Sequence, residues 1–367
     1  MSLSIATTRF LAGYLFFAAT LVGLVLLEVN ADSSVPVCDA PKFFLRNGEA
    51  VYLESLPQRM VSVLDRKTTN EENQCADASP CRRDIRITTI DEQKGLYYVE
   101  DFLTPMECHS MIGFGTPDRF TRSPVVEQSL DDIPDTDGDS VSSVKMGSIR
   151  TSSTCPLLFS RIYMPLMEKV KAQMPHLVEE LILTNDVTHR AADLLFLSAY
   201  AGVEGGSTES TDSPLTVEDA VSRIEPLQLI HYRPGEFYQA HHDHKAYYMD
   251  DGDTQKDASE RGYPDRERTM LVFLNTVEHG GHLKFDSLHN GLQFVPHRGD
   301  AVIWSNVDTT GVVDHDMIHQ GMPPDVVDES KPSQNDKYAL NIWIRNEPID
   351  VSKPMSGSRV GVSYRQQ

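Results

Sequence analysis

The stretch Tyr232-Arg-Pro-Gly-Glu-Phe-Tyr-Gln-Ala-His-His-Asp243 decides the fold of this 367-residue chain. Its second half begins with two aromatic residues, and residues 237–244 are expected to form a β-strand. Side chains alternate between the two faces of a strand, so His241 and Asp243 should point to the same side. A histidine and a carboxylate on one face can bind one metal ion together. His242 should point away from that face and serve in packing.

Strand-forming runs recur from Leu227 onward and are separated by short turns. The expected strands are residues 227–232, 237–244, 269–274, 282–285, 301–304 and 339–343. Many short β runs of this kind predict a mainly β domain with supporting helices (α+β), built on a double-stranded β-helix or jelly-roll core. Such a barrel has a mouth where ligands from distant strands can meet.

A second histidine from a distant strand would complete a metal site. His319 and His315 are candidates, and the acidic neighbours of His315 indicate an exposed loop. Because His319 lies 78 positions beyond His241, only the fold can bring the two together. Two histidines and one carboxylate leave iron positions open, which 2-oxoglutarate and dioxygen can fill. The far carboxylate of 2-oxoglutarate would then need a buried cation, and Lys337 offers a compact charge.

Supporting helices are expected upstream of these strands. The domain opens with strand-like residues 85–89 and 95–99. Thr104-Pro-Met-Glu107 then has the pattern of a capped helix start, with Pro in the first turn and Glu closing a capping box. A second helix is expected over residues 156–174, and Pro165 must kink or restart it.

Six segments, taken in order, resemble motifs of the prolyl 4-hydroxylases, a family of 2-oxoglutarate/Fe(II)-dependent dioxygenases. The first, from Tyr232 to Asp243, is similar to the family's Y-x-x-G-x-x-Y-x-x-H-x-D. Upstream, Arg150-Thr-Ser-Ser153 is similar to its R-T-S segment. The six segments are Tyr232–Asp243, Arg266–Asn275, Gly280–Phe285, Arg298–Trp304, Met317–Pro323 and Lys337–Trp343.

The resemblance implies a role for each matching residue. His241, Asp243 and His319 occupy the positions that bind iron, and Lys337 the position that anchors 2-oxoglutarate. Tyr232 stands where the family's tyrosine hydrogen-bonds the co-substrate. Three further residues match positions near the substrate groove, although each could equally serve in packing: Tyr238, Arg266 and Trp343.

The chain departs from the family pattern in three places. Lys337 follows His319 by eighteen positions, about eight more than is usual, and the extra residues 325–335 are expected to form a loop. Lys331 is the competing lysine, but it lacks the Trp six positions later. Leu283 replaces a Thr, and Arg345 stands where many members have His.

The function that the resemblance implies is hydroxylation of a peptidyl residue, namely proline to 4-hydroxyproline, with release of succinate and CO2. The cofactors and co-substrates would be Fe(II), 2-oxoglutarate and O2, with L-ascorbate keeping the iron reduced. The partner would be a Pro-rich protein or peptide. Three alternatives stay open: a related oxygenase acting on another residue or a small molecule, a non-catalytic β-helix that binds Pro-rich peptides, and a cupin-like metal protein.

Composition and the N-terminal segment indicate the compartment. A net charge of −21 argues against a nucleic-acid partner, whose binding surface would be basic.

Residues 1–31 are expected to be a signal peptide or an uncleaved signal anchor that spans the membrane. Residues 32–84 are then a stem or linker, 85–350 the dioxygenase domain, and 351–367 a tail. The expected location is the endoplasmic reticulum, either lumenal or anchored as a type II membrane protein; nothing specifies an oligomeric state.

Five cysteines and two acidic stretches complete the pattern. Cys75 and Cys81, in a polar loop, make the easiest disulfide pair, while Cys108 falls in the first expected helix and could be a buried thiol. The acidic residues 131–139 lack the final Glu of a calcium-binding EF-hand loop and are expected to be solvated. Residues 201–220 are expected to form a surface loop.

Overall fold

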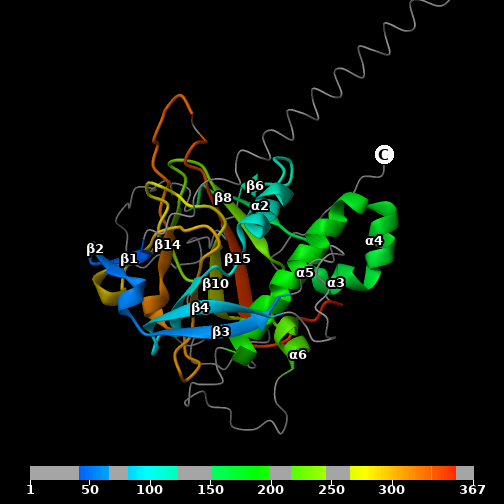
Figure 1. Cartoon of the computed structure of the whole chain (residues 1–367), viewed down its shortest axis with the longest axis horizontal. Helices are drawn as coiled ribbons and strands as arrows, with labels where there is room; N and C mark the ends of the chain where they lie inside the picture. Colours follow the sequence, from blue (N-terminus) through cyan, green and yellow to red (C-terminus); the bar gives the residue numbers. More distant parts are fainter. Residues whose placement is uncertain are drawn as a thin grey trace, which may run out of the picture. The chain divides into compact units, whose positions relative to one another are not determined.

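Two antiparallel sheets form the frame of the protein (Figure 1). The computed structural model describes residues 41–65, 82–122, 150–198, 216–244, 265–331 and 333–352. The larger sheet has nine strands in the order β3-β4-β5-β13-β10-β15-β8-β7-β6. These strands are β3 (Gln58–Leu64), β4 (Arg82–Asp91), β5 (Leu96–Glu100), β13 (Ala301–Ser305), β10 (Arg266–Phe273), β15 (Lys337–Arg345), β8 (Gln228–Tyr232), β7 (Ser153–Pro156) and β6 (Thr121–Arg122).

The smaller sheet has six strands in the order β2-β1-β12-β11-β14-β9. Its strands are β2 (Glu49–Tyr52), β1 (Phe43–Arg46), β12 (Leu292–Phe294), β11 (Leu283–Phe285), β14 (His319–Gly321) and β9 (Tyr238–His241). The predicted mainly β jelly-roll class with supporting helices is therefore confirmed. The six expected strands are all present, although β9 ends at His241 and β15 extends to Arg345.

Strand β10 shows how the two-residue period divides the core. Leu271 and Phe273 face the smaller sheet and pack with Phe285 and Phe294, so this cluster fills the space between the sheets. Met270 and Val272 belong to a second cluster, in which the other face of the large sheet packs against helices. Burial on both faces explains why this part of β10 is apolar without alternation.

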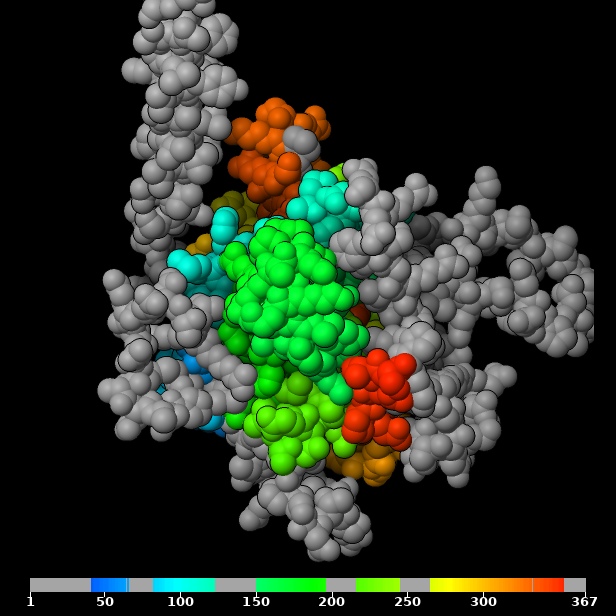
Figure 2. All heavy atoms as spheres, turned by 90° about the vertical axis from the view of Figure 1, so that its right-hand side faces the viewer, coloured from blue at the N-terminus to red at the C-terminus, as the bar shows by residue number. Residues whose placement is uncertain are grey.

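Helices cover that outer face of the large sheet. They are α2 (Pro105–Phe114), α3 (Ser160–Tyr163), α4 (Met167–Gln173), α5 (Val178–Ala192) and α6 (Val217–Ser222), and α5 runs on into the π-helix η5 (Asp193–Ser198). Figure 2 shows this helical face, with the chain's last described residues beside α6. The carbonyl of Ser222 accepts a hydrogen bond from the backbone N–H of Ile349, which fixes that contact.

Two helix predictions are confirmed in detail. Thr104 and Glu107 form the reciprocal capping box that begins α2, with Pro105 in the first turn. Pro165 lies in the 3-10 turn Met164–Leu166, which separates α3 from α4. Cys108, in α2, is a buried free thiol as expected.

Helix α5 was not predicted from the sequence. Its residues include Thr184 and Thr188, whose hydroxyls donate hydrogen bonds to carbonyls one turn earlier. Such side-chain hydrogen bonds slightly destabilise a helix. Tertiary contacts stabilise it instead. The buried carboxylate of Glu180 pairs with Arg119, and the buried Arg190 pairs with Glu107. These partners lie outside the helix, so local periodicity does not reveal it.

Two segments differ from the sequence expectation. Residues 43–64, expected in the stem, supply β1, β2 and β3; β1 pairs with β12 and β3 with β4. Phe44 and Val63 from this segment are fully buried, and the compact unit that contains both sheets begins at Lys42. The expected loop 201–220 ends in α6, because Thr216 and Asp219 form a capping box and Ala220 and Val221 are buried.

Several predictions fall outside the described residues. They concern the N-terminal segment 1–31, the pair Cys75 and Cys81, the acidic stretch 131–139 and most of the tail. Among the helices that are described, none combines the length and the apolar character needed to cross a bilayer.

Candidate metal and co-substrate site

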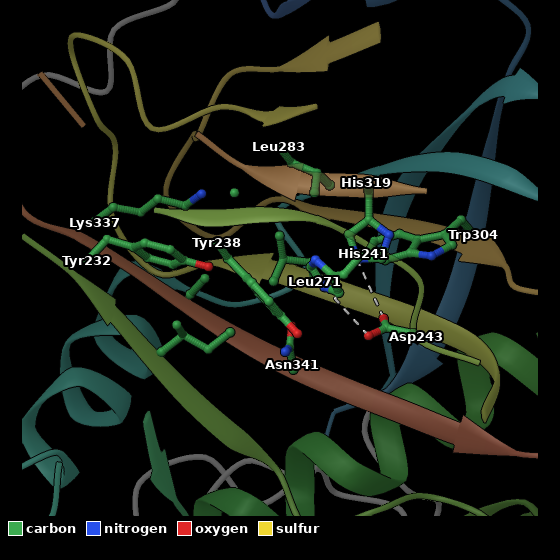
Figure 3. Close-up of a pocket in the computed structure, with 13 residues that line it drawn as sticks. Tyr232, Tyr238, His241, Asp243, Leu271, Leu283, Trp304, His319, Lys337 and Asn341 are labelled. Atoms are coloured by element: carbon green, nitrogen blue, oxygen red, sulfur yellow. Dashed lines mark ion pairs between the residues drawn. The ribbon is translucent and has the colours of Figure 1, made fainter. Parts of the chain in front are cut away.

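A pocket opens between the two sheets (Figure 3). Strands β8, β10, β13 and β15 of the large sheet and β9, β11 and β14 of the small sheet contribute its lining. It contains most of the residues singled out in the sequence: Tyr232, Tyr238, His241, Asp243, His319 and Lys337. Residues up to 105 positions apart therefore meet in one place.

Strand pairing brings the two histidines together. His319 of β14 lies directly opposite His241 of β9 in the antiparallel register, and their ring centroids are 4.3 Å apart. Asp243 follows two residues after His241, with Oδ1 at 3.9 Å from Nε2 of His241 and Oδ2 at 3.7 Å from Nε2 of His319. One ligand atom from each of the three residues lies within 4.8 Å of the others. One metal ion could bind all three.

Hydrogen bonds to the backbone orient both imidazoles. Nδ1 of His241 bonds to the carbonyl of Gln239 at 2.8 Å, and Nδ1 of His319 to that of Met317 at 2.9 Å. A carbonyl only accepts, so each Nδ1 carries the proton and each Nε2 keeps its lone pair for the site. This is the tautomer that a metal-binding histidine needs.

Burial and neighbouring charges set the protonation states of His241 and Asp243. Burial lowers the pKa of His241 well below its usual value, and the adjacent His319 lowers it further. Burial by itself would raise the pKa of Asp243, but His319, His241 and Arg266 together with the Thr269 hydroxyl hold it well below its usual range. The histidine is therefore neutral and the carboxylate ionised at neutral pH. This donor set fits Fe(II), which accepts imidazole and carboxylate ligands.

Arg266 and Trp343, expected near the substrate groove, lie behind Asp243 and do not line the pocket. The indole Nε1 of Trp343 donates to Oδ2 of Asp243 at 3.1 Å. The guanidinium of Arg266 stacks over the Trp343 ring at 3.5 Å and forms two hydrogen bonds with the buried Glu225. Glu225 also accepts from Arg345, the residue that departs from the family's His. Both arginines are thus held by one carboxylate.

Lys337 is a buried lysine that faces the pocket. Its side chain is 1% exposed, and its Nζ lies 4.8 Å from the centre of the Tyr232 ring. Within the part of the chain that the structure describes, no carboxylate forms an ion pair with it. Burial accordingly lowers the pKa of Lys337 to about 7. A buried ammonium without a protein carboxylate indicates an anionic ligand.

Gly321 makes room for Tyr232, because a Cβ at this position would come within 2.7 Å of the Tyr232 hydroxyl. Lys331, the competing lysine, is exposed and outside the pocket. The described residues between Asp325 and Asn335 form a loop as expected, and the Asn335 amide fixes it by donating to the carbonyls of His279 and Asp325.

The other histidines take the places expected of them. His242 is buried, and its ring bonds to the carbonyl of Asp314 and to the backbone N–H of His244. His315 is exposed. The group that the described residues bring together as possible metal ligands is His241, Asp243 and His319.

Arg150 is a site residue to which the sequence reasoning assigned no role. It is 8% exposed, its guanidinium lies 4.3 Å from the centre of the Tyr238 ring, and its Nε donates to Ser152. Its Nη2 is buried without a hydrogen-bond partner among the described residues. The Tyr238 ring in turn stacks on His241 at 3.5 Å. The R-T-S segment was the signal, but only the fold places it beside the metal ligands.

Known proteins are similar to the segment of the chain that carries most of these residues. Residues 227–345 match a family model described as the 2OG-Fe(II) oxygenase superfamily. The chain is 29% identical over 140 residues to human prolyl 4-hydroxylase subunit alpha-3, which covers 36% of this chain and 22% of the relative. It is 30% identical over 125 residues to a putative prolyl 4-hydroxylase of Acanthamoeba polyphaga mimivirus, covering 33% and 45%.

Among solved structures, the chain is similar to a viral collagen prolyl hydroxylase from Paramecium Bursaria Chlorella virus-1. The likeness covers 70% of this chain and 99% of that one, with 17% identity and a TM-score of 0.36. The chain spans less than half the length of the two relatives named above.

Proposed function

Since residues 227–345 match the family model of the 2OG-Fe(II) oxygenase superfamily, we propose that this chain hydroxylates peptidyl proline to 4-hydroxyproline. His241, Asp243 and His319 would bind Fe(II), and Lys337 would bind 2-oxoglutarate. The observation that carries the proposal is the buried Lys337, without a protein carboxylate, in the same pocket as the three ligands. A metal site alone would not require this cation.

The pocket residues divide the work of binding and orientation. Bound Fe(II), with 2-oxoglutarate and dioxygen, would supply the oxidising chemistry and release succinate and CO2. Lys337 would neutralise the far carboxylate of 2-oxoglutarate, and the Tyr232 hydroxyl beside Gly321 would donate a hydrogen bond to it. The apolar side chains of Leu271 and Leu283 line the pocket and keep water from it. L-ascorbate would keep the iron reduced between turnovers.

An extended Pro-rich peptide is the substrate that suits the site. A polyproline II segment is already ordered and loses little entropy when it docks on aromatic side chains. Tyr238 lines the pocket beside His241. The relatives' names, prolyl 4-hydroxylases, support proline as the residue.

We expect Pro-rich peptides to gain one oxygen at a proline when incubated with the protein, Fe(II), 2-oxoglutarate and ascorbate. Mass spectrometry of a peptide panel measures this, and the His319→Ala variant is the matched control in which both peptide oxidation and succinate release should stop. Succinate release without oxygen on any proline would retain the oxygenase and remove the prolyl assignment. Peptide binding without succinate release would instead indicate a non-catalytic binding protein.

We propose that the protein acts in the secretory pathway, in the endoplasmic reticulum, because residues 1–31 have the composition of a signal peptide or signal anchor. Sequencing of the mature N-terminus is expected to begin at Asp32 for a cleaved signal peptide, or at Met1 or Ser2 for an anchor. A cytosolic protein in which Cys75 and Cys81 are reduced would contradict both forms.

A further inference from the structure

The carboxylate of Asp243 uses its two oxygens differently. Oδ2 accepts hydrogen bonds from the Thr269 hydroxyl at 2.7 Å and from the Trp343 indole at 3.1 Å. Oδ1 accepts none from the described residues; Nε2 of His241 and Nη1 of Arg266 are each 3.9 Å away. One oxygen is therefore saturated by protein donors, while the other keeps its lone pairs for a metal ion.

The Thr269 hydroxyl is itself controlled from behind by Asn306. The amide Nδ2 of Asn306 lies 3.0 Å from Oγ1 of Thr269, and its Oδ1 lies 3.0 Å from Nε1 of Trp304. An indole N–H can only donate, so Oδ1 of Asn306 must face Trp304 and its NH2 group must face Thr269. The threonine oxygen then accepts from Asn306, which leaves its single proton for Asp243.

The network lies on a rigid part of the sheet. Thr269 and Trp304 are directly paired across β10 and β13. Asn306 is fully buried, and its backbone N–H donates to the carbonyl of Glu267 at 2.8 Å. The Trp304 ring also packs edge-on against the ring of His319 at 4.7 Å. The same indole thus contacts one metal ligand and begins the donor chain that ends on another.

We propose that Asn306 is a positioning residue for the metal site, which acts through the Thr269 hydroxyl to make Asp243 a one-oxygen ligand through Oδ1. The inference rests on the proposed function, because it requires that His241, Asp243 and His319 bind the metal. Without Asn306 the Thr269 hydroxyl can rotate, and Asp243 loses the shorter of the two hydrogen bonds that hold Oδ2 away from the ion. A carboxylate that binds through both oxygens would occupy a position needed by the co-substrates.

The test is Mn(II) binding to the metal-free full-length protein, measured by calorimetry in the absence of 2-oxoglutarate. Loss of outer partners of metal ligands typically weakens binding roughly 10–100-fold, and Thr269→Val should fall in this range. Asn306→Ala should lower the affinity about 10-fold. Thr269→Ser keeps the hydroxyl and should therefore retain most of the affinity that Thr269→Val loses. Since both residues act on the same oxygen, the double variant Asn306→Ala/Thr269→Val should lose no more than Thr269→Val alone.

A general loss of stability would give a different pattern. Thr88→Val is the matched control, because Thr88 is a fully buried threonine on β4 whose hydroxyl accepts from Gln58. It should leave Mn(II) affinity unchanged, whatever its effect on thermal unfolding of the metal-free protein. Asn306→Ala with the affinity of the unmodified protein, or losses that multiply in the double variant, would overturn the inference. Failure of the unmodified protein to bind Mn(II) would instead overturn the proposed metal site.

Discussion

Replacement of Asp243 by alanine is expected to abolish metal binding and turnover. The carboxylate is the anionic member of the ligand group and lies within 3.9 Å of one histidine and 3.7 Å of the other. Because loss of a mere outer partner costs roughly 10–100-fold in affinity, loss of the ligand itself should cost more. Mn(II) calorimetry and succinate release measure the two effects separately.

The matched control for Asp243→Ala is Asp316→Ala. Asp316 is another aspartate beside a histidine in the sequence, but its carboxylate is half exposed and pairs with Lys94. Its removal should leave metal affinity and succinate release at the level of the unmodified protein. Full activity of Asp243→Ala, or loss of metal in Asp316→Ala, would mean that a different carboxylate binds the ion.

Replacement of Lys337 by alanine is expected to weaken 2-oxoglutarate binding by about 3–5 kcal/mol, the usual cost of leaving a buried charge without its partner. This corresponds to a rise in Kd on the order of 10²–10⁴-fold. Titration of the Mn(II)-loaded protein with 2-oxoglutarate measures it, and Mn(II) affinity itself should be unchanged because Lys337 does not contribute to the ligand group.

Two variants calibrate the Lys337 effect. Tyr232→Phe removes one hydrogen bond to the co-substrate and should cost only about 1 kcal/mol. Lys331→Ala should have no effect, since Lys331 is exposed and outside the pocket. If Lys331→Ala were the damaging change, the assignment of the 2-oxoglutarate anchor would be wrong.

The pH dependence of stability is a second readout for Lys337. Burial lowers its pKa from the usual 10.5 to about 7 in the ligand-free protein. Between these values the unfolded chain binds a proton at this lysine that the folded protein does not, so the free energy of unfolding should rise from pH 7 toward pH 10.5. Lys337→Met should remove this rise and stabilise the ligand-free protein most at pH 7 and below. Urea unfolding at several pH values measures the difference.

The fold class was predictable because the strands that form the site carry strong local signals. The runs ending in Tyr232 and His241 and those around Trp304 and Trp343 are rich in aromatic and branched residues. The capping box at Thr104 could also be recognised from the sequence. Helix α5 was not, since its charged residues are satisfied by partners from α2 and the segment before β6. Residues 43–64 were expected in the stem, yet β1 pairs with β12, which lies far along the chain, and β3 pairs with β4.

The sequence by itself indicated which residues to look for in the site, because the His-x-Asp spacing is local and the six motifs occur in the order of the family they resemble. Only the tertiary structure decided what each residue does there. Trp343 and Arg266 match positions near the family's substrate groove, yet they lie behind Asp243. They come from the paired strands β15 and β10, and the Trp343 indole donates a hydrogen bond to Asp243. Arg150 and Asn306 reach the site through contacts with residues far away in sequence. Such contacts depend on strand register, which pattern alone does not specify.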